Sequence, residues 1–429
     1  MIARTALGAL AALLSGTAAQ AQDMAITGGR VVIGDGSAPI EGGTVVIRAG
    51  KVVAAGAGVA VPPGVAVLDA KGKWVTPGLV VAVTDLGLVD VGAVDDSNDS
   101  GAGKAPFNAA LDISAAINPA AQPVAVARAN GVTRAAVAPL GTGAIFEGQG
   151  AVIDTGSDPK AVTAPRAFQY VELGEDGARL AGGSRVAAYA VLKNALDEAR
   201  EIALAPAGAR RDDVLLTRRD AAALVPVVTG RQPLYVHVER AADIRMALAL
   251  KGDYPALKLV LVGASEGWLA AREIAAAGVP VLATPLNDLP SRFEQLAATQ
   301  SNVGRMAAGG VRVALGAYGG NSPAVAQYAG NLVALTKVPR ATGLSWDKAF
   351  AAISSGPAEA MGMGDRFGSL RAGRAGDVVI WDGDPLDVRS GVVKVFIDGV
   401  EQSLGNHQSR LKDRYQTVPE GSLPKAYDW

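Results

Sequence analysis

Hydrophobic residues near the two ends of the chain come in short runs rich in Val and Ile, each closed by Gly and a polar residue or Ala. Residues 24–75 contain RVVIGDG, TVVIRAGKVVAAG and VAVLDAKGKWV, and a similar texture returns in residues 375–402 with AGDVVIWDGD and VVKVFIDGVEQ. Runs of β-branched residues closed by turn residues predict consecutive β-hairpins. Because each piece alone is small for a stable sheet, we expect one composite β-sandwich built from residues 24–75 and 366–404.

The middle of the chain, residues 76–365, alternates apolar runs with helical patterns instead. Its clearest helix should run from Ser184 to about Leu204, with Ser184 as the N-cap. Apolar runs that read as strands include residues 79–83, 133–138, 233–238, 258–262, 279–283 and 311–315. Repeated β-α units predict a mainly parallel sheet, and the interval is long enough for a (β/α)8 TIM-like barrel, which takes about 250 residues.

The composition is typical of a folded protein, and its balanced charges give no strong net electrostatic field. Hydrophobic residues make up 49% and charged residues 19%, and 40 Lys plus Arg balance 41 Asp plus Glu. This balance disfavours nucleic acid and anionic lipid as partners. Cysteine is absent from the sequence, which excludes disulfides, thiolate metal ligands and a Cys nucleophile.

The N-terminus has the layout of a secretory signal. Arg4 precedes an apolar run over residues 6–14, and Ala19-Gln20-Ala21 offers a cleavage site. An uncleaved membrane anchor is the alternative, but the run is shorter than the ~20 residues that a span needs. We therefore expect a signal peptide at 1–21, a periplasmic or secreted protein without membrane insertion, and a C-terminal surface extension at 405–429.

Several segments resemble the amidohydrolase superfamily. They are VTPGL (75–79), GVTRAAV (131–137) with the later GQGAV (148–152), YVHVERAADI (235–244), SSGPAEAMGM (354–363), GSLRAGRAGDVVIWDGDPLDV (368–388) and VFIDG (395–399). The chain is similar to the exported imidazolonepropionase-like and prolidase-like subgroup over nearly its whole mature length. The resemblance implies a barrel at 76–365 with a small sandwich, and a hydrolase acting on carbon-nitrogen bonds other than peptide bonds. It also implies zinc or another divalent metal, held by His-x-His on strand one, His on strands five and six, and Asp on strand eight.

This chain departs from that ligand set at most positions. The strand-one positions read Val83 and Asp85, and Val83 cannot bind a metal. Strand six has Gly263 or Ala264 where many relatives carry His, whereas His237 is kept on strand five.

Strand eight also departs, because Tyr318 stands near the position of the Asp. The whole sequence has 2 His, so a His-rich zinc site is excluded and we expect no metal cofactor. A carboxylate-only Ca or Mg site in the loop from Asp90 to Asp99 is left open beside the alternative of a solvated loop.

His237 has two interpretations. It is either a relic ligand that now acts as a general base with Glu239 or Glu266, or a hydrogen-bonded interior histidine. Asp85 follows a strand that opens to the same barrel mouth, so it is predicted to orient the imidazole, and the two residues form the candidate catalytic pair. The candidate substrate pocket consists of Tyr318, Asn321, Glu239 and Glu266.

Three functions remain open from sequence. The first is an amidohydrolase-like protein with a degenerate metal site that binds a small molecule or peptide. The second is a hydrolase of a cyclic amide or dipeptide that uses His237 and Asp85 with one unusual metal or none. The third is a subunit of a homo- or hetero-oligomer whose partner completes the site.

Overall fold

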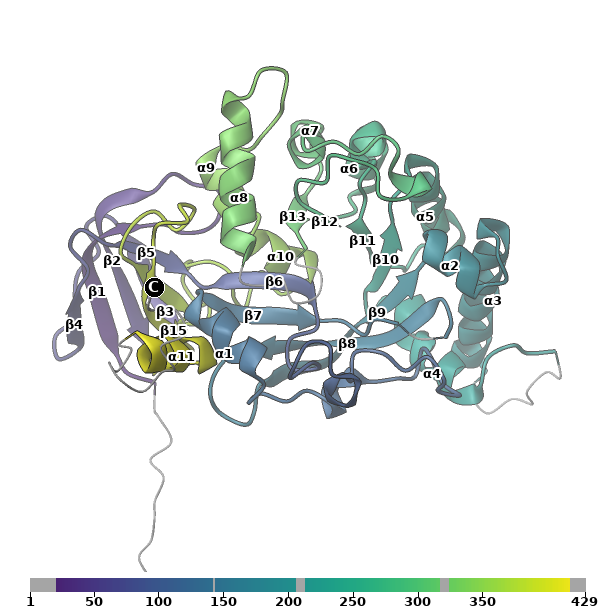
Figure 1. The fold of residues 1–429 in the computed structure, drawn as a ribbon, viewed down its shortest axis with the longest axis horizontal. Coiled ribbons are helices and arrows are strands. Elements are labelled where there is room, and N and C mark those ends of the chain that lie inside the picture. The colour runs from purple at the N-terminus through teal and green to yellow at the C-terminus, as the bar shows by residue number, and fades with distance from the viewer. Residues whose placement is uncertain (1–20, 142, 206–212, 317–323, 417–429) are drawn as a thin grey trace, which may run out of the picture.

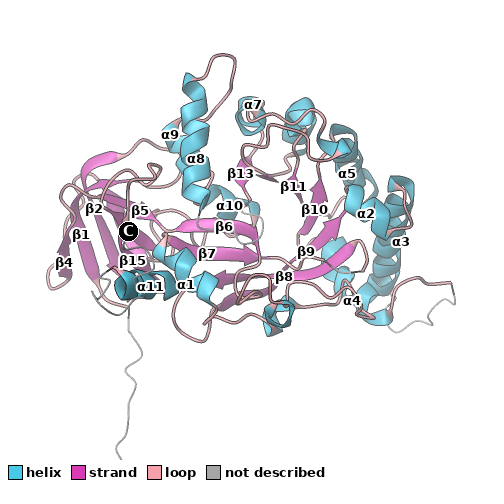
Figure 2. Cartoon of the chain, viewed as in Figure 1, coloured by secondary structure: helices cyan, strands magenta, loops and turns pink. Residues whose placement is uncertain are grey.

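The computed structural model describes residues 21–141, 143–205, 213–316 and 324–416, and these form two eight-stranded sheets. Sheet A lies at one end of the molecule and sheet B, with most of the helices around it, lies at the other (Figure 1). Figure 2 shows the same division by secondary structure. The predicted composite architecture of a TIM-like barrel with a small β module is thereby confirmed.

Sheet A combines strands from both ends of the chain. Its strands are β1 (Met24–Val31), β2 (Ile40–Arg48), β3 (Lys51–Gly56), β4 (Ala66–Asp69), β5 (Trp74–Pro77), β14 (Val378–Trp381), β15 (Val392–Ile397) and β16 (Val400–Gln402). The order is β16-β15-β14-β5-β1-β2-β3, with β4 paired to β1. The two ends join where β5 pairs antiparallel with β14, with Val75 opposite Ile380. Both side chains are buried in one apolar cluster, so neither end forms this core alone.

Sheet B forms a nearly closed barrel. Its strands are β6 (Leu79–Thr84), β7 (Val132–Val137), β8 (Phe146–Asp154), β9 (Val162–Glu172), β10 (Leu234–Val238), β11 (Leu259–Gly263), β12 (Val281–Ala283) and β13 (Val313–Leu315). The strands follow one another in sequence order around the sheet. Strands β9 to β13 and the pair β6-β7 are parallel, as predicted.

Strand β8 departs from the predicted pattern because it is antiparallel to both of its neighbours. The reason is the length of the connections: residues 138–145 and 155–161 are too short to hold the helix that a parallel crossover needs. This part of the barrel is a meander, and neither β8 nor β9 was among the strand candidates.

The barrel is completed by a short segment between its first and last strands. Ile353 O accepts a hydrogen bond from Val80 N on β6 at 2.9 Å, and Ala352 O accepts one from Leu315 N on β13 at 2.9 Å. Helix α10 (Ser355–Ala360) follows directly and packs on both strands. Backbone groups of this segment thus substitute for direct pairing of β6 with β13.

Helices cover the outside of the barrel. They are α1 (Gln122–Ala129), α2 (Glu175–Leu180), α3 (Arg185–Leu204), α4 (Arg218–Val228), α5 (Ala241–Asp253), α6 (Ala271–Ala277), α7 (Asn302–Ala308), α8 (Val325–Ala334) and α9 (Trp346–Ala351), with the short 3-10 helices η3 (Gly267–Ala270) and η4 (Phe293–Gln295) among them. The predicted N-cap is present, since Ser184 Oγ accepts a hydrogen bond from Val186 N at 3.2 Å. In the described ranges, none of the helices has the length and apolar character to cross a membrane.

A buried arginine connects the two sheets. Arg134 on β7 donates to Asp377 next to β14 through two hydrogen bonds of 2.7 and 2.9 Å, and it pairs with Asp398 after β15 at 2.8 Å.

At the C-terminal end of the described residues, α11 (His407–Tyr415) lies against α1. The rest of the predicted C-terminal extension, residues 417–429, falls outside the described residues.

Candidate functional site

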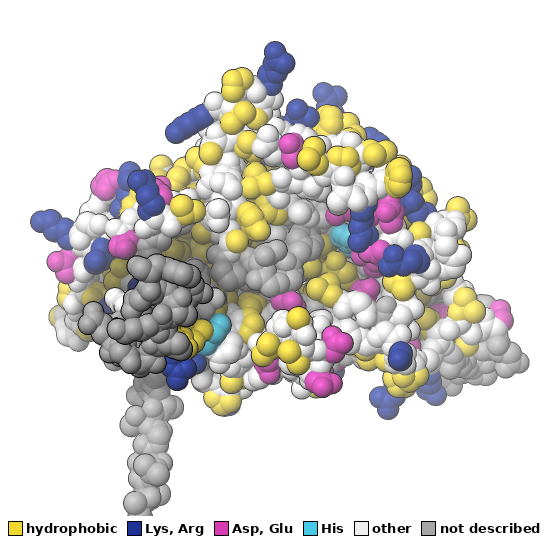
Figure 3. Space-filling view, viewed as in Figure 1, with side chains coloured by type: hydrophobic (Ala, Val, Ile, Leu, Met, Phe, Trp, Pro, Cys, Tyr) yellow, Lys and Arg dark blue, Asp and Glu magenta, His cyan; other side chains and the backbone are white. Residues whose placement is uncertain are grey.

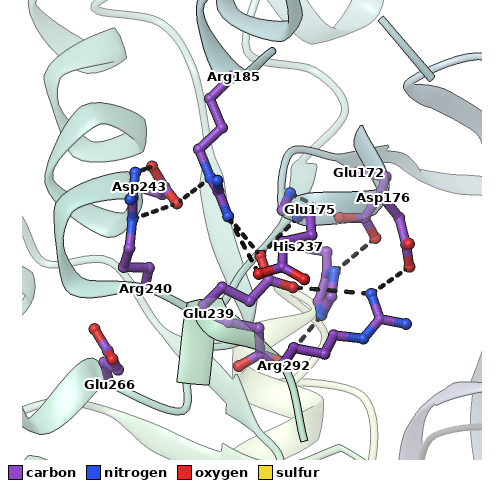
Figure 4. A network of polar contacts seen from close by, with 12 residues as sticks. Glu172, Glu175, Asp176, Arg185, His237, Glu239, Arg240, Asp243, Glu266 and Arg292 are labelled. Carbon is purple, nitrogen blue, oxygen red and sulfur yellow. Dashed lines mark hydrogen bonds and ion pairs between the residues drawn. The ribbon is translucent and has the colours of Figure 1, made fainter. Parts of the chain in front are cut away.

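The carboxyl ends of β9, β10 and β11 bring charged side chains to one mouth of the barrel. Glu172 is the last residue of β9, and His237 lies beside it on β10 in the register of the two strands. On the other side, His237 is opposite Val262 of β11. Because parallel strands in a barrel end on one face, these side chains meet where the loops after the strands gather. Figure 4 shows the resulting network.

His237 is held by two carboxylates. Its Nδ1 lies 2.6 Å from Glu172 Oε2, and its Nε2 lies 3.1 Å from Glu239 Oε1. Burial lowers the pKa of His237, but the two carboxylates raise it by more, so that the pKa stands well above 6.5. The ring is therefore an imidazolium at neutral pH, with each nitrogen donating to a carboxylate.

Both carboxylates are fixed by backbone amides. Glu172 Oε1 accepts a hydrogen bond from Gly174 N at 2.8 Å, and Glu239 Oε2 accepts one from Ser265 N at 2.7 Å. Burial raises the pKa of Glu239, but contacts with His237 and Ser265 lower it by more, so its net pKa is lowered. One oxygen of each carboxylate therefore contacts His237, and the other accepts a hydrogen bond from the loop after a strand.

A second group of charges surrounds this triad. The buried Glu294 accepts a hydrogen bond from Glu175 N at 2.6 Å and pairs with Arg185 at 3.3 Å. Arg185 also contacts Asp243 on α5 at 2.9 Å, and Arg240 contacts the same carboxylate at 2.8 Å (Figure 4). These contacts fasten α2, α3 and α5 to the mouth.

Asp85 does not take part in the triad. It follows β6 and is half-buried, and burial raises its pKa more than a hydrogen bond with its own backbone lowers it. Both nitrogens of His237 have other partners, Glu172 and Glu239. Glu172 and Glu239 therefore orient the imidazole in the way that we had predicted for Asp85.

The structure places the predicted pocket residues in different surroundings. Glu239 contacts His237, which agrees with one predicted arrangement. Glu266 instead accepts backbone hydrogen bonds from Ala241 N at 3.0 Å and Ala297 N at 2.9 Å, so it anchors two loops away from the imidazole. Tyr318 and Asn321 lie outside the described residues.

Glu172 is the residue that sequence reasoning missed. Its signal was available, since a carboxylate followed by Leu-Gly ends an apolar run, FQYVE. That signal carries meaning only once residues 162–172 are recognised as a barrel strand next to the one that holds His237.

The described residues do not fit the metal arrangement of the superfamily. The strand-one side chain of Val83 is apolar and fully buried. At Gly263, φ is +85°, and an added Cβ would lie 2.6 Å from Glu239 Oε1, so Glu239 fills the space of a strand-six side chain. Within the described ranges, no group of three or more His, Cys, Asp or Glu side chains is placed to hold a metal, and this includes the loop from Asp90 to Asp99.

Comparisons with known proteins agree with the fold. Residues 261–401 match the profile of the amidohydrolase family. The chain is 37% identical to the amidohydrolase tasK of Hapsidospora irregularis over 87 residues, which are 19% of this chain and only 9% of that protein. Both matches are partial, and the family match begins after His237.

Solved structures resemble the chain over most of its length. An amidohydrolase from Thermotoga maritima MSB8 has a TM-score of 0.76 at 23% identity, over 88% of this chain and 99% of that chain. A prolidase solved with N-methylphosphonate-L-proline has a TM-score of 0.53 at 16% identity, over 88% of this chain and 98% of that one. At such identities the likeness shows the shared fold. The chain thus matches the amidohydrolase family over residues 261–401 and shares the fold of solved amidohydrolases over most of its length.

Proposed function

We propose that this protein uses the amidohydrolase barrel to bind a small molecule or peptide at its mouth, without the metal-dependent hydrolysis of the superfamily. One observation carries the proposal: both nitrogens of His237 donate to carboxylates, Glu172 at 2.6 Å and Glu239 at 3.1 Å. An imidazolium has no free lone pair for a metal and cannot accept a proton as a general base. The histidine that the superfamily uses as a ligand is here part of a salt-bridged scaffold.

Charge at the mouth indicates the chemistry of the ligand. Carboxylates in the network outnumber cations (Figure 4). The acids are Glu172, Glu175, Asp176, Glu239, Asp243, Glu266 and Glu294, and the cations are Arg185, Arg240, Arg292 and protonated His237. An excess of negative charge among partly buried side chains favours a ligand that carries an amino or other cationic group.

Metal analysis tests this proposal directly. Protein purified without chelator should contain no stoichiometric transition metal, and neither EDTA nor added zinc should change its melting temperature, since a specific ligand of the folded state would raise it. Amine-bearing small molecules and dipeptides should raise the melting temperature without being hydrolysed. A stoichiometric metal that is lost in His237→Asn would overturn the proposal.

Hydrolysis of a cyclic amide or dipeptide is a second candidate, and Asp85 is the observation that favours it. A half-buried carboxyl group with a raised pKa, at the end of strand one, is suited to donate and accept a proton. If turnover is found, Asp85→Asn and His237→Ala should each reduce kcat/KM by roughly 100-fold. Asp347→Asn on α9 is the matched control and should leave turnover unchanged.

We also infer export of the protein from the signal-like pattern in residues 1–21. Sequencing the N-terminus of protein recovered from a periplasmic fraction should give Gln22 as the first residue. Recovery of full-length protein from the membrane fraction would contradict this inference.

A further inference from the structure

A pocket of about 400 Å³ lies on the face of the barrel opposite the mouth. Its lining includes Pro280, Arg312 and Val313, which stand at the amino ends of β12 and β13. The network around His237 lies instead at the carboxyl ends of the strands, where acidic and basic side chains gather near α2 and α5 (Figure 3). The pocket is therefore separate from the candidate site, and its size falls within the range of ligand pockets, about 300–1,000 Å³.

Segments far apart in the sequence form the apolar walls of the pocket. Helix α7 contributes Ala307, the connection from α7 to β13 contributes Val311, and the loop before α9 contributes Leu344. The segment that closes the barrel between β6 and β13 contributes Ala352, whose carbonyl accepts the hydrogen bond from Leu315 N. Backbone hydrogen bonds of the barrel thus hold these walls in place, and their side chains are small or aliphatic.

The charged groups that line the pocket leave an excess of positive charge. They are two cations, Arg312 and Lys348, and two acids, Asp35 and Glu359. Asp35 is paired with Arg371 at 3.0 Å, so its charge is compensated. Arg312 donates to a neutral backbone carbonyl after α6, and in the described parts of the chain neither it nor Lys348 has an ion-pair partner. Two unpaired cations against the one acid Glu359 favour an anionic ligand.

A buried hydroxyl adds a hydrogen-bond donor to this positive charge. Ser355, the first residue of α10, is 7% exposed and lines the pocket. Its hydroxyl has no hydrogen-bond partner among the residues that the structure describes, whereas the hydroxyl of the neighbouring Ser354 donates to Phe350 O at 2.8 Å. Buried polar groups are hydrogen-bonded as a rule. The partner of the Ser355 hydroxyl must therefore be a water molecule or a ligand atom inside the pocket.

We propose that this pocket binds a small organic carboxylate with an apolar body. Arg312 and Lys348 share the charge of the carboxylate, and Ser355 donates a hydrogen bond to it. The apolar body packs on Val311 and Leu344, which removes both surfaces from water. A cationic ligand, of the kind proposed for the mouth, would meet two unpaired cations here. The inference does not depend on the proposed function, because it concerns another face of the barrel and a ligand of opposite charge.

A titration of the protein with 4-methylpentanoate, followed by ligand-detected NMR, tests the proposal. The alcohol 4-methyl-1-pentanol and the amine 4-methylpentylamine have the same apolar body with a neutral and a cationic head group. The carboxylate should bind with a dissociation constant of about 1 mM or lower, which is within reach of a ligand of this size. The alcohol and the amine should bind roughly 10-fold more weakly, and added salt should weaken the carboxylate most.

Variants of the lining place the ligand in the pocket. Lys348→Gln and Arg312→Gln should each raise the dissociation constant of 4-methylpentanoate by roughly 5-fold or more, because each removes one cation. Ala307→Leu should abolish binding by filling the apolar side of the pocket. Lys71→Gln is the matched control and should bind as the wild type does, since Lys71 is exposed and lies in the turn between β4 and β5, outside the lining.

Far-UV circular dichroism and the melting temperature without ligand should show that all four variants remain folded. Carboxylate binding that persists unchanged in Lys348→Gln, Arg312→Gln and Ala307→Leu would refute the proposed site. Equal affinity for the carboxylate and the alcohol would refute the proposed ligand class. A wild-type protein that binds neither 4-methylpentanoate nor 3-phenylpropanoate would refute both and leave water as the partner of the Ser355 hydroxyl.

Discussion

At the scale of single residues, this barrel mouth is distinguished by what surrounds His237. In a metal site the imidazole would be neutral and would give a lone pair to the ion. Here Glu172 and Glu239 contact its two nitrogens, and burial without these carboxylates would lower its pKa instead of raising it. The protonated ring therefore carries a positive charge at the position where a metal site would hold a metal cation.

Protonation of His237 should appear in the pH dependence of stability. Its pKa is higher in the folded state than the value of about 6.5 in the unfolded state, so folding retains a proton that unfolding releases. The stabilising contribution is therefore complete below about pH 6.5 and is lost as the pH rises from there through the folded-state pKa. Relative to wild type, His237→Gln should be destabilised by about 1–3 kcal/mol at pH 6, and the difference should shrink at alkaline pH.

Urea unfolding of both proteins at a series of pH values measures this difference. The control is His407→Gln on α11, since no described residue hydrogen-bonds Nδ1 of that ring. A difference for His237→Gln that stays constant or grows with pH would contradict the assigned imidazolium.

Gly263 shows how one glycine excludes the strand-six ligand. Its φ is +85°, and an added Cβ would lie 2.6 Å from Glu239 Oε1 and 3.0 Å from His237 Cδ2. A side chain here would meet both strain and a clash with the triad. Gly278 at the end of α6 also has a positive φ, of +62°, but an added Cβ there would meet nothing within 4 Å.

Substitutions at the two glycines therefore separate the cost of backbone strain from the cost of a steric clash. Gly278→Ala should cost about 1–2 kcal/mol through its backbone conformation alone. Gly263→Ala should cost a further 1–3 kcal/mol, roughly, because Glu239 and His237 must move. Denaturant midpoints at equal m-values measure both costs. Equal losses of stability for the two variants would show that Glu239 and His237 can move aside at no energetic cost.

At the scale of elements, the contact between the barrel and sheet A depends on ionic groups removed from water. Arg134 on β7 is 4% exposed and Asp377 before β14 is 3% exposed. Removing one partner of such a pair leaves the other charge buried, and this costs more than the net contribution of the intact pair.

Arg134→Met should therefore destabilise the protein by about 3–5 kcal/mol, because the carboxylate of Asp377 loses its counter-ion. The control is Arg245→Met, whose pair with Glu273 at 2.8 Å is about half exposed on both sides and should matter little. Equilibrium unfolding in urea gives the comparison. Similar small losses for both variants would show that Arg134 does not hold the two sheets together.

At the scale of the whole molecule, the two ends of the chain form one sheet, sheet A, and the barrel lies between them in the sequence. Strand β5 pairs with β1 on one side and with β14 on the other, so its ladder requires both ends. Trp381 of β14 extends the contact, because its Nε1 donates to Thr76 Oγ1 of β5 at 2.9 Å.

We therefore expect sheet A and the barrel to unfold together. Hydrogen exchange followed by mass spectrometry, at increasing urea concentration, should show peptides of β1 to β5, β14 and β15 losing protection at the same midpoint as peptides of β10 and β11. Earlier exchange of residues 378–402 alone would show that the C-terminal strands form a separate, weaker unit.

The sequence by itself determined the architecture and the scarcity of histidine and cysteine side chains. Periodicity in residues 24–75 and 375–402 predicted the composite sheet, because alternation and turn residues are local properties. The scarcity of histidine and the Val83 substitution follow from composition and position alone. Only the tertiary structure decided which side chains surround His237. Glu239 was already a candidate partner of His237, but Glu172 meets His237 through strand register, and residues 65 positions apart in sequence carry no local sign of that contact. Strand β8 escaped prediction for a related reason, since its direction depends on the short connections around it and not on the periodicity of its own residues.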